Sequence, residues 1–222
     1  MFDEKGFLGM KLKKIVASFP VVALSVVFCY LVLDERAALF VKKLWMYNKQ
    51  FSLFSLNIPD MLFSLVCLIT VSAWIIFFYL TRKGINNTHT RFFQLIAISV
   101  PLANMVKWLF KFAFGRISTR FWLLYPRSHE FHWLHGTGNF TGFPSGHMAV
   151  FTALVAALWV YYPRHRTVYL FSLAALALAL IVTNYHFISD IIAGAYTGLF
   201  VHAATDASLT YLRRSQEKNH PI

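Results

Sequence analysis

The sequence predicts an all-α polytopic membrane protein: a bundle of six transmembrane helices with a short interfacial helix, forming a single domain over residues 1–222. Of the 222 residues, 58% are hydrophobic and only 14% are charged, whereas a soluble domain carries about a quarter charged residues. The apolar residues are gathered into six long runs. Lys and Arg outnumber Asp and Glu by 21 to 9, but they are dispersed between these runs, which favours the basic loops of a membrane protein over a nucleic-acid-binding surface.

The composition excludes two further classes. A disordered chain would not carry so much apolar surface. A scaffold stapled by disulfides is excluded because the two cysteines, Cys29 and Cys67, both lie inside apolar runs. Residues 1–14 resemble the start of a signal peptide, but the apolar run that follows is long and lacks a clear cleavage site. We therefore expect an uncleaved first helix.

The six runs differ in how easily they would cross a membrane, since a bilayer core of about 30 Å needs about 20 helical residues. Three are long enough on their own: 15–33, 61–80 and 168–185. The others reach that length only if polar residues are admitted: 92–106, extended to 115 through Lys107 and Lys111; 148–162; and 191–212, with His202 and Asp206. Residues 34–50 mix charges with Phe40, Leu44 and Trp45, which predicts the interfacial helix.

Basic residues predict the orientation. With six spans, 12 of the 21 basic residues fall on the side of the two termini and 9 on the other. Because cytoplasmic loops carry the excess of Lys and Arg, we expect a multi-pass protein of the plasma (bacterial inner) membrane with both termini in the cytoplasm. The excess of basic residues on the side of the termini becomes larger if those on the outer side that serve a chemical role are left out of the count.

Four helix ends on that outer side collect the polar residues that would form a site. They bring together four cations, two imidazoles, one hydroxyl and one carboxylate: Lys107, Lys111, Arg116, Arg120, His147, His186, Ser145 and Asp190. Cations neutralise a phosphate group, and Arg presents paired donors to its oxygens. This combination predicts a phosphate site.

The spacing of these residues supports the prediction. Lys107 and Lys111 are one helical turn apart and project from one face. Gly146 lies where the fourth helix begins, and the free N–H groups of a helix N-terminus bind anions. His186 and Asp190 are four residues apart, so the carboxylate can hold one ring nitrogen of His186 and leave the other free to attack phosphorus.

Two strings of residues resemble the type 2 phosphatidic acid phosphatase superfamily, over about residues 90–200. Its second motif is complete in Pro144-Ser145-Gly146-His147, and the His-x3-Asp half of its third motif is complete in His186 to Asp190. The first motif keeps the spacing from Lys111 to Gly115-Arg116. Two departures remain: the Arg-Pro of the first motif falls on Ser118-Thr119, and the Ser-Arg of the third falls on Ala179-Leu180. Arg120 and the uncharged Asn184 are the nearest substitutes.

The resemblance implies a function and a role for each residue. It implies an integral membrane phosphatase that acts on a lipid phosphate or diphosphate through a phosphohistidine, without metal or other cofactor. His186 would be the nucleophile, Asp190 its orienting partner and His147 the general acid and base. Phosphate oxygens would be held by Lys111, Arg116 and Arg120, with Ser145, the backbone at Gly146 and Lys107. The partners implied are lipid phosphate and membrane lipids, with no nucleic acid; the oligomeric state is not indicated.

Two alternatives to hydrolysis use the same fold. One is a phosphotransferase that passes the phosphoryl group to a lipid or sugar acceptor. The other is a non-catalytic lipid-binding or transport protein, which the missing Arg at Leu180 would favour.

Other histidines are interpreted as structural. His202 and Asp206 form a second His-x3-Asp pair, about 18 Å further along the last helix at 1.5 Å per residue, and are expected to satisfy each other. His129, His132 and His135 are interpreted as loop residues at the mouth of the site rather than as a zinc site.

Overall fold

The computed structural model describes residues 4–45, 58–125 and 131–219, and this part of the chain is helical throughout its regular structure. The all-α prediction is confirmed there, since the only β-type pairing among these residues is a single bridge between Arg116 and Phe131. The helices are α1 (Glu4–Phe28), the π-helix η1 (Cys29–Leu33), α2 (Asp34–Trp45), α4 (Ile58–Arg82), α5 (Thr88–Phe114), α6 (Thr119–Leu124), α7 (Gly146–Tyr161), the short 3-10 helix η2 (Pro163–His165), α8 (Arg166–Val182) and α9 (Ile188–Asn219).

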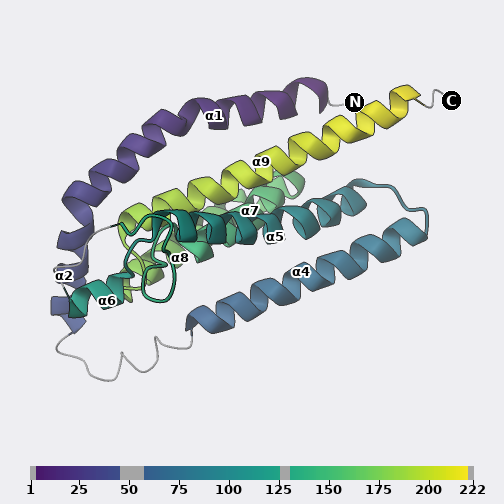
Figure 1. The fold of residues 1–222 in the computed structure, drawn as a ribbon. Helices are drawn as coiled ribbons and strands as arrows, with labels where there is room; N and C mark the ends of the chain where they lie inside the picture. The colour runs from purple at the N-terminus through teal and green to yellow at the C-terminus, as the bar shows by residue number, and fades with distance from the viewer. Residues whose placement is uncertain (1–3, 46–57, 126–130, 220–222) are drawn as a thin grey trace.

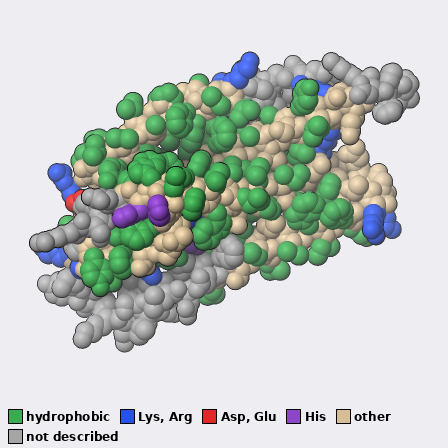
Figure 2. Space-filling model, viewed as in Figure 1, with side chains coloured by type: hydrophobic (Ala, Val, Ile, Leu, Met, Phe, Trp, Pro, Cys, Tyr) green, Lys and Arg blue, Asp and Glu red, His purple; other side chains and the backbone are tan. Residues whose placement is uncertain are grey.

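The long helices run roughly alongside one another (Figure 1). Helices α5, α7 and α9 all pack on each other and form the centre of the bundle, α1 packs on α9, α4 on α5, and α8 on α7. Helix α2 and the short α6 lie at one end, together with the loop that precedes α7, whereas the first turns of α1 and the last turns of α9 lie at the opposite end (Figure 1). In Figure 2, hydrophobic side chains cover much of the visible face along the length of the bundle.

Four segments of the described chain are long and apolar enough to cross a membrane: Leu12–Leu44, Ser64–Arg82, Thr88–Phe114 and Pro163–Val182. Only 6 to 11% of the apolar window is buried in three of them, against 44% in Thr88–Phe114. These three therefore present their apolar surface outward, which is what a lipid environment requires, while α5 lies in the middle of the bundle. These long apolar helices are consistent with a multi-pass membrane protein.

The predicted number of six spans is not confirmed. All six apolar runs are helical over most of their length. However, α7 has 16 residues, about 24 Å at 1.5 Å per residue, which is short for a hydrocarbon core of about 30 Å. Helix α9 has 32 residues but is not among the four candidates, and it buries the polar residues Asp190, His202 and Asp206.

The first helix does not end where the sequence suggested. Helix α1 continues through the π-helix Cys29–Leu33 directly into α2, and the chain bends there so that α2 turns across the end of the bundle (Figure 1). Wide turns of this kind are common causes of helix bends and frequently occur at functional sites. The surface helix predicted over 34–50 corresponds to α2 over Asp34–Trp45, and residues 46–50 lie outside the described residues. Its first residue, Asp34, is buried at 2% exposure, so the helix begins inside the protein.

Two glycines bring α9 very close to α7. A Cβ atom at Gly194 would lie 2.4 Å from the carbonyl oxygen of Ser145, and one at Gly198 would lie 2.1 Å from that of Ala149. Only a residue without a side chain fits at either position. Small residues four apart allow helix backbones to approach in this way, especially in membranes. The close approach sets the first turn of α7 against the first turn of α9, where the backbone N–H of Ser145 donates to the carbonyl of Asp190 at 2.9 Å.

Candidate active site

The predicted site residues gather at the end of the bundle where α5 ends and α7 and α9 begin. Lys107 and Lys111 come from the last turns of α5, Ser145 and His147 from the start of α7, and Asp190 from the first turn of α9. His186 lies in the short loop between α8 and α9. Residues that are distant in sequence are therefore brought to one place by the α5–α7–α9 packing.

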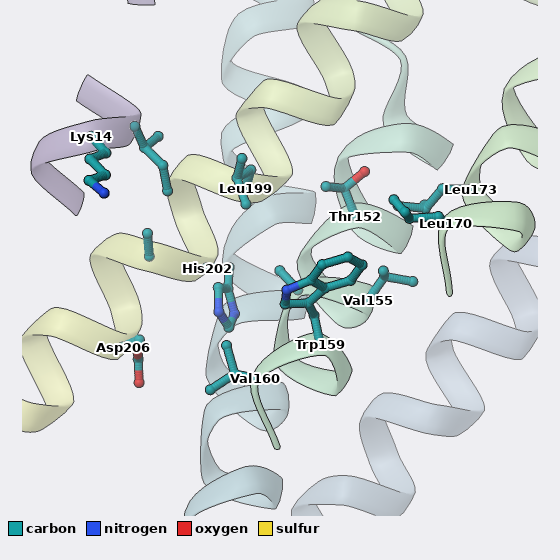
Figure 3. Close-up of a pocket in the computed structure, with 13 residues that line it drawn as sticks. Lys14, Thr152, Val155, Trp159, Val160, Leu170, Leu173, Leu199, His202 and Asp206 are labelled. Carbon is teal, nitrogen blue, oxygen red and sulfur yellow. The ribbon is translucent and has the colours of Figure 1, made fainter. Parts of the chain in front are cut away.

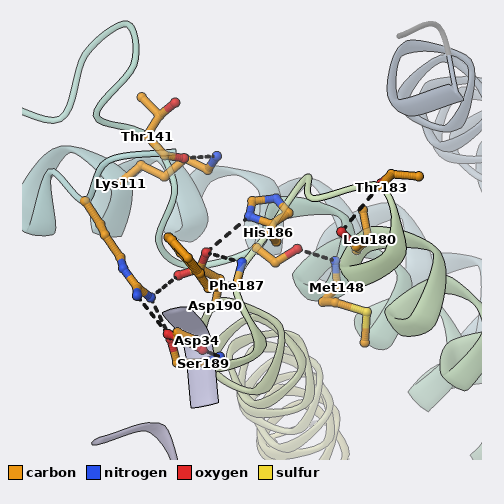
Figure 4. Close-up of polar contacts among 12 residues, drawn as sticks. Asp34, Lys111, Thr141, Met148, Leu180, Thr183, His186, Phe187, Ser189 and Asp190 are labelled. Carbon is orange, nitrogen blue, oxygen red and sulfur yellow. Dashed lines mark hydrogen bonds and ion pairs between the residues drawn. The ribbon is translucent and has the colours of Figure 1, made fainter. Parts of the chain in front are cut away.

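The carboxylate of Asp190 faces the ring of His186. It is fully buried, and its Oδ2 atom accepts a hydrogen bond from the backbone N–H of Phe187 at 3.0 Å. The same oxygen lies 3.5 Å from Nδ1 of His186, and Figure 4 shows the ring directed at this carboxylate. With Nδ1 facing Asp190, Nε2 is the nitrogen available for chemistry.

Burial sets the protonation state of His186. The ring is only 5% exposed. Burial lowers the pKa of His186 below its ordinary value, and the opposing effects of the carboxylate of Asp190 and a backbone hydrogen bond to Gly142 do not fully reverse this; the nearby cation Lys111 lowers the pKa further. A neutral imidazole is the form that can act as a nucleophile.

His147 faces His186 across the site. The two ring centroids are 6.3 Å apart, and both rings also meet the ring of Tyr185, at 5.4 Å from His147 and 5.2 Å from His186. His147 is half-buried. The two imidazoles and the ring of Tyr185 therefore form one cluster at this end of the bundle.

The two lysines of α5 border the same space. Nζ of Lys111 donates to the carbonyl oxygen of Thr141 at 2.5 Å. The buried side chain of Lys107 lies across the first residue of α7, where a Cβ atom at Gly146 would be 3.0 Å from its Nζ. A side chain at Gly146 would therefore make the end of Lys107 shift away from the start of α7. Both ammonium groups also lie over the ring of Trp108, at 5.3 and 5.7 Å.

Ser145 and Gly146 form the N-terminus of α7. Ser145 is fully buried, and its Oγ accepts from the backbone N–H of Met148 at 3.4 Å, which is the geometry of a helix N-cap. The hydroxyl therefore satisfies one of the free N–H groups of the first turn. The remaining N–H groups of this turn carry the positive end of the helix dipole toward the site.

Arg120 reaches the site through Tyr185. Its guanidinium lies over that ring, 4.9 Å from the centroid, and donates to the carbonyl of Thr183 at 3.3 Å. Leu180, which stands where the superfamily motif has Arg, is buried against Met148 and Ile191. Asn184 is buried in a left-handed conformation (φ +50°) in the same turn. Arg120 is thus the positive charge nearest to this turn among the predicted site residues.

Arg116 has a different set of partners from those the sequence suggested. Its Nη1 atom contacts Oδ1 of Asp190 and Oγ of Ser189, both at 2.6 Å, and its Nη2 contacts Oδ2 of Asp34 at 2.8 Å. Burial alone would lower the pKa of this guanidinium, but the two carboxylates outweigh the burial and raise the pKa above its ordinary value. Arg116 is therefore a permanent cation between two carboxylates, and its contact with phosphate stays a prediction.

The sequence interpretation missed Asp34, Ser189 and Tyr185. Asp34 is the most informative, because it follows an apolar run directly and is buried in the site. The sequence did contain a signal for Asp34, because this carboxylate follows a predicted span at its outer end, on the same side as four cations.

The second His–Asp pair lies away from this site. His202 and Asp206 line a cavity of about 390 Å³ between α1, α7, α8 and α9, together with Lys14 and Trp159 (Figure 3). The neighbouring wall is apolar, with Val155, Leu170, Leu173 and Leu199. His132 and His135 are exposed; the ring of His132 packs on Phe140, and His135 is hydrogen-bonded to the carbonyl of Trp133. His129 lies outside the described residues.

The fold and the site together define a helical membrane protein with an oriented His–Asp pair beside a cation cluster. A family model described as the PAP2 superfamily matches residues 92–214. The match covers more than half of the chain and confirms the resemblance: the chain belongs to the PAP2 superfamily. Membership supports phosphatase activity toward lipid phosphates in general. A search of the curated proteins and a search of the solved structures found no match.

Proposed function

We propose that this protein is an integral membrane lipid phosphatase that hydrolyses a lipid phosphate or diphosphate through a phosphohistidine. The observation that carries the proposal is the pair His147 and His186, whose ring centroids are 6.3 Å apart. The ring of His186 faces the buried carboxylate of Asp190, and Lys107 and Lys111 border the pair. A phosphate group bound beside this cluster would contact both imidazoles, and the lysines would supply the charge that it needs.

The reaction has two steps. In the first, Nε2 of His186 attacks phosphorus while the bond from phosphorus to the lipid oxygen breaks, and His147 donates a proton to that oxygen. In the second, His147 takes a proton from water, the water oxygen attacks phosphorus, and the bond from phosphorus to Nε2 breaks. Inorganic phosphate leaves and both histidines return to their starting states. No metal or other cofactor takes part in this mechanism.

The non-bridging oxygens of the phosphate are assigned to the groups that border the histidines. Lys111 and Lys107 neutralise the charge from the side of α5, and the N–H groups at Gly146 approach from α7. Arg120 supplies the charge that the third motif lacks at Leu180, by reaching over Tyr185. Ser145 contributes by capping α7 and fixing its first turn.

The apolar helices imply that the substrate is a lipid. Its chains would remain in the hydrocarbon layer while its phosphate enters the end of the bundle between α5, α7 and the α8–α9 loop. We assign this end to the outer or periplasmic face of the plasma membrane, with six spans formed by α1, α4, α5, α7, α8 and α9. The excess of basic residues on the side of the termini supports this orientation.

The test is a phosphate-release assay on the purified protein with isoprenyl diphosphates, phosphatidic acid, phosphatidylglycerol phosphate and lipid A phosphates. We expect His186→Ala to lower turnover by about 10⁴-fold or more, and His147→Ala to lower it by about 10²- to 10⁴-fold. His202→Ala is the matched control, a buried histidine of the same bundle outside the site, and is expected to retain activity.

Each other outcome points to another function. If phosphate is released only when a lipid or sugar acceptor is present and appears on that acceptor, the protein is a phosphotransferase. If no substrate phosphorylates His186 and wild type and His186→Ala behave alike, the protein is non-catalytic and the proposal fails.

A further inference from the structure

Asp34 belongs to a buried polar network that reaches the site from outside the matched family segment. It stands at the start of α2, whereas the family model begins at residue 92. Its Oδ1 accepts from the backbone N–H of Ser189 at 3.0 Å, and its Oδ2 accepts from the hydroxyl of Ser189 and from Nη2 of Arg116. Asp34 thereby holds the first turn of α9 and the guanidinium of Arg116 at once.

Arg116 extends this network to Asp190. Its Nη1 contacts Oδ1 of Asp190 at 2.6 Å, while Oδ2 of Asp190 faces Nδ1 of His186. The network therefore runs from Asp34 through Arg116 and Asp190 to His186, and each of these side chains is at most 5% exposed. Figure 4 shows Asp34 and Ser189 on one side of Asp190 and His186 on the other.

The surroundings of Arg116 leave no space for a phosphate. Aromatic rings enclose its guanidinium, with centroids at 4.4 Å for Phe187, 4.9 Å for Tyr30 and 5.6 Å for Phe131. The cavity bordered by Tyr30, Asp34 and Arg116 holds only about 10 Å³, which is about the space of one water molecule. Moving Arg116 onto a substrate would also leave two buried carboxylates without their cation, which is strongly unfavourable.

We propose that Asp34 and Arg116 are positioning residues: the N-terminal helix supplies a carboxylate that fixes Arg116, and Arg116 fixes Asp190 and so the ring of His186. This inference rests on the proposed function only in taking His186 as the nucleophile. It gives Arg116 a role that acts through Asp190 rather than on phosphate, and it makes the helix pair α1–α2 a part of the catalytic apparatus.

The charged and titratable groups around His186 determine how this network affects its protonation. Asp190 from α9 lies nearest, Lys111 approaches from α5, His147 from α7, and Tyr185 precedes it in the loop; Arg120 of α6 lies behind Tyr185. Asp34 and Arg116 act from beyond Asp190. Removing the negative charge of Asp34 makes the surroundings more positive, and removing the positive charge of Arg116 makes them more negative.

The two substitutions should therefore shift the titration of His186 in opposite directions. We expect Asp34→Asn to lower the pKa of His186 and Arg116→Gln to raise it, measured by NMR of histidine-labelled protein with His186→Gln to assign the signal. Asp206→Asn removes a buried carboxylate from the other part of α9 and is expected to leave that titration unchanged. This measurement needs no turnover, so it tests the network even if the proposed function fails. Should Arg116→Gln not fold, Asp34→Asn carries the test alone.

Kinetics separate positioning from phosphate binding. If the protein is a phosphatase, Asp34→Asn and Arg116→Gln should lower kcat by about 10- to 100-fold, because the catalytic groups are misplaced. Inhibition by inorganic phosphate should stay as in wild type, because neither side chain contacts phosphate. Asp34→Glu should restore part of kcat. Weakened phosphate inhibition in Arg116→Gln, or a His186 titration and kcat in folded Asp34→Asn equal to those of wild type, would overturn the proposal.

Discussion

At the scale of single residues, the site depends on burial. Asp190 and Ser145 are fully buried, and His186 is nearly so, so each polar group has to be paired inside the protein. The consequence is a set of side chains with fixed directions: the carboxylate of Asp190 can serve both Arg116 and His186 because its two oxygens face different ways. Such fixed geometry is what a nucleophile and its orienting group need.

The buried imidazole of His186 predicts a particular pH dependence. Because burial lowers its pKa, the ring stays neutral and nucleophilic into more acidic solution than a free histidine, whose pKa is about 6.5. We expect the acid limb of the kcat/KM profile to lie below that value. Asp190→Asn should move the limb to still lower pH, since Asp190 raises the pKa, and should reduce kcat as well. An acid limb that moves to higher pH in this variant would contradict the assignment.

Lys111 predicts an effect on substrate binding. A hydrogen bond to a charged group contributes about 1.5–3 kcal/mol, so Lys111→Met is expected to raise KM about 10- to 100-fold. Lys111→Arg should recover part of this loss because it keeps the charge. Lys83→Met, in an exposed turn after α4, is the matched control. Steady-state phosphate release measures all three, and an unchanged KM in Lys111→Met would remove this lysine from the binding site.

At the scale of helices, the contact between α7 and α9 decides whether a site exists. Asp190 is on α9 and His147 on α7, and the two first turns are joined by the backbone hydrogen bond from Ser145 to Asp190. Gly194 and Gly198 allow this approach because a Cβ atom at either position would collide with the backbone of α7. The glycines lie about one and two turns along α9 from Asp190, so they determine how closely the two halves of the candidate site approach.

Gly198→Val is expected to push α7 and α9 apart. Overpacking of this kind costs about 1–3 kcal/mol, and a displacement of about 1 Å at the site reduces turnover about 10²-fold. Thermal unfolding in detergent and phosphate release would record both effects. Ser208→Val adds the same side chain at an exposed position of α9 and should change neither. Full activity in Gly198→Val would show that the helix contact does not control the site.

At the scale of the whole molecule, polar and apolar surfaces are separated along the bundle. The α4–α5 turn lies at the same end as the first turns of α1 and the last turns of α9, and the site lies at the other (Figure 1). A bilayer around the apolar helices would place these two ends on opposite sides. Under the proposed function, the site would then face one aqueous compartment, while the lipid chains of the substrate would stay in the membrane.

Cysteine labelling in intact cells tests this arrangement. In a Cys67→Ser background, which leaves only the buried Cys29, we expect Thr137→Cys in the loop before α7 to react with a membrane-impermeant maleimide. Asn86→Cys, in the exposed α4–α5 turn, should react only after the membrane is permeabilised. The reverse pattern would mean that the protein is inserted the other way, and reaction of both in intact cells would contradict the membrane arrangement.

The sequence by itself determined the helical class and the family, and it predicted the chemical groups of the candidate site. Apolar runs of span length identify helices because a bilayer permits few other structures. The segments from Pro144 to His147 and from His186 to Asp190 are short local motifs, so they can be recognised from the sequence alone. The number of spans did not follow from the sequence alone, because the count of six depended on runs such as the one that forms α7, which is short for a membrane.

Only the tertiary structure decided which residues meet. Asp34 and Ser189 are 155 residues apart in sequence, and no local pattern places a carboxylate after the first apolar run beside the start of the last helix. Arg116 stood at the spacing of a phosphate ligand, yet its partners were chosen by burial: a guanidinium enclosed by Tyr30 and Phe187 takes the carboxylates that share its pocket. Motif spacing records which groups a site contains, but the pairing of buried charges is set by packing between helices that the sequence leaves far apart.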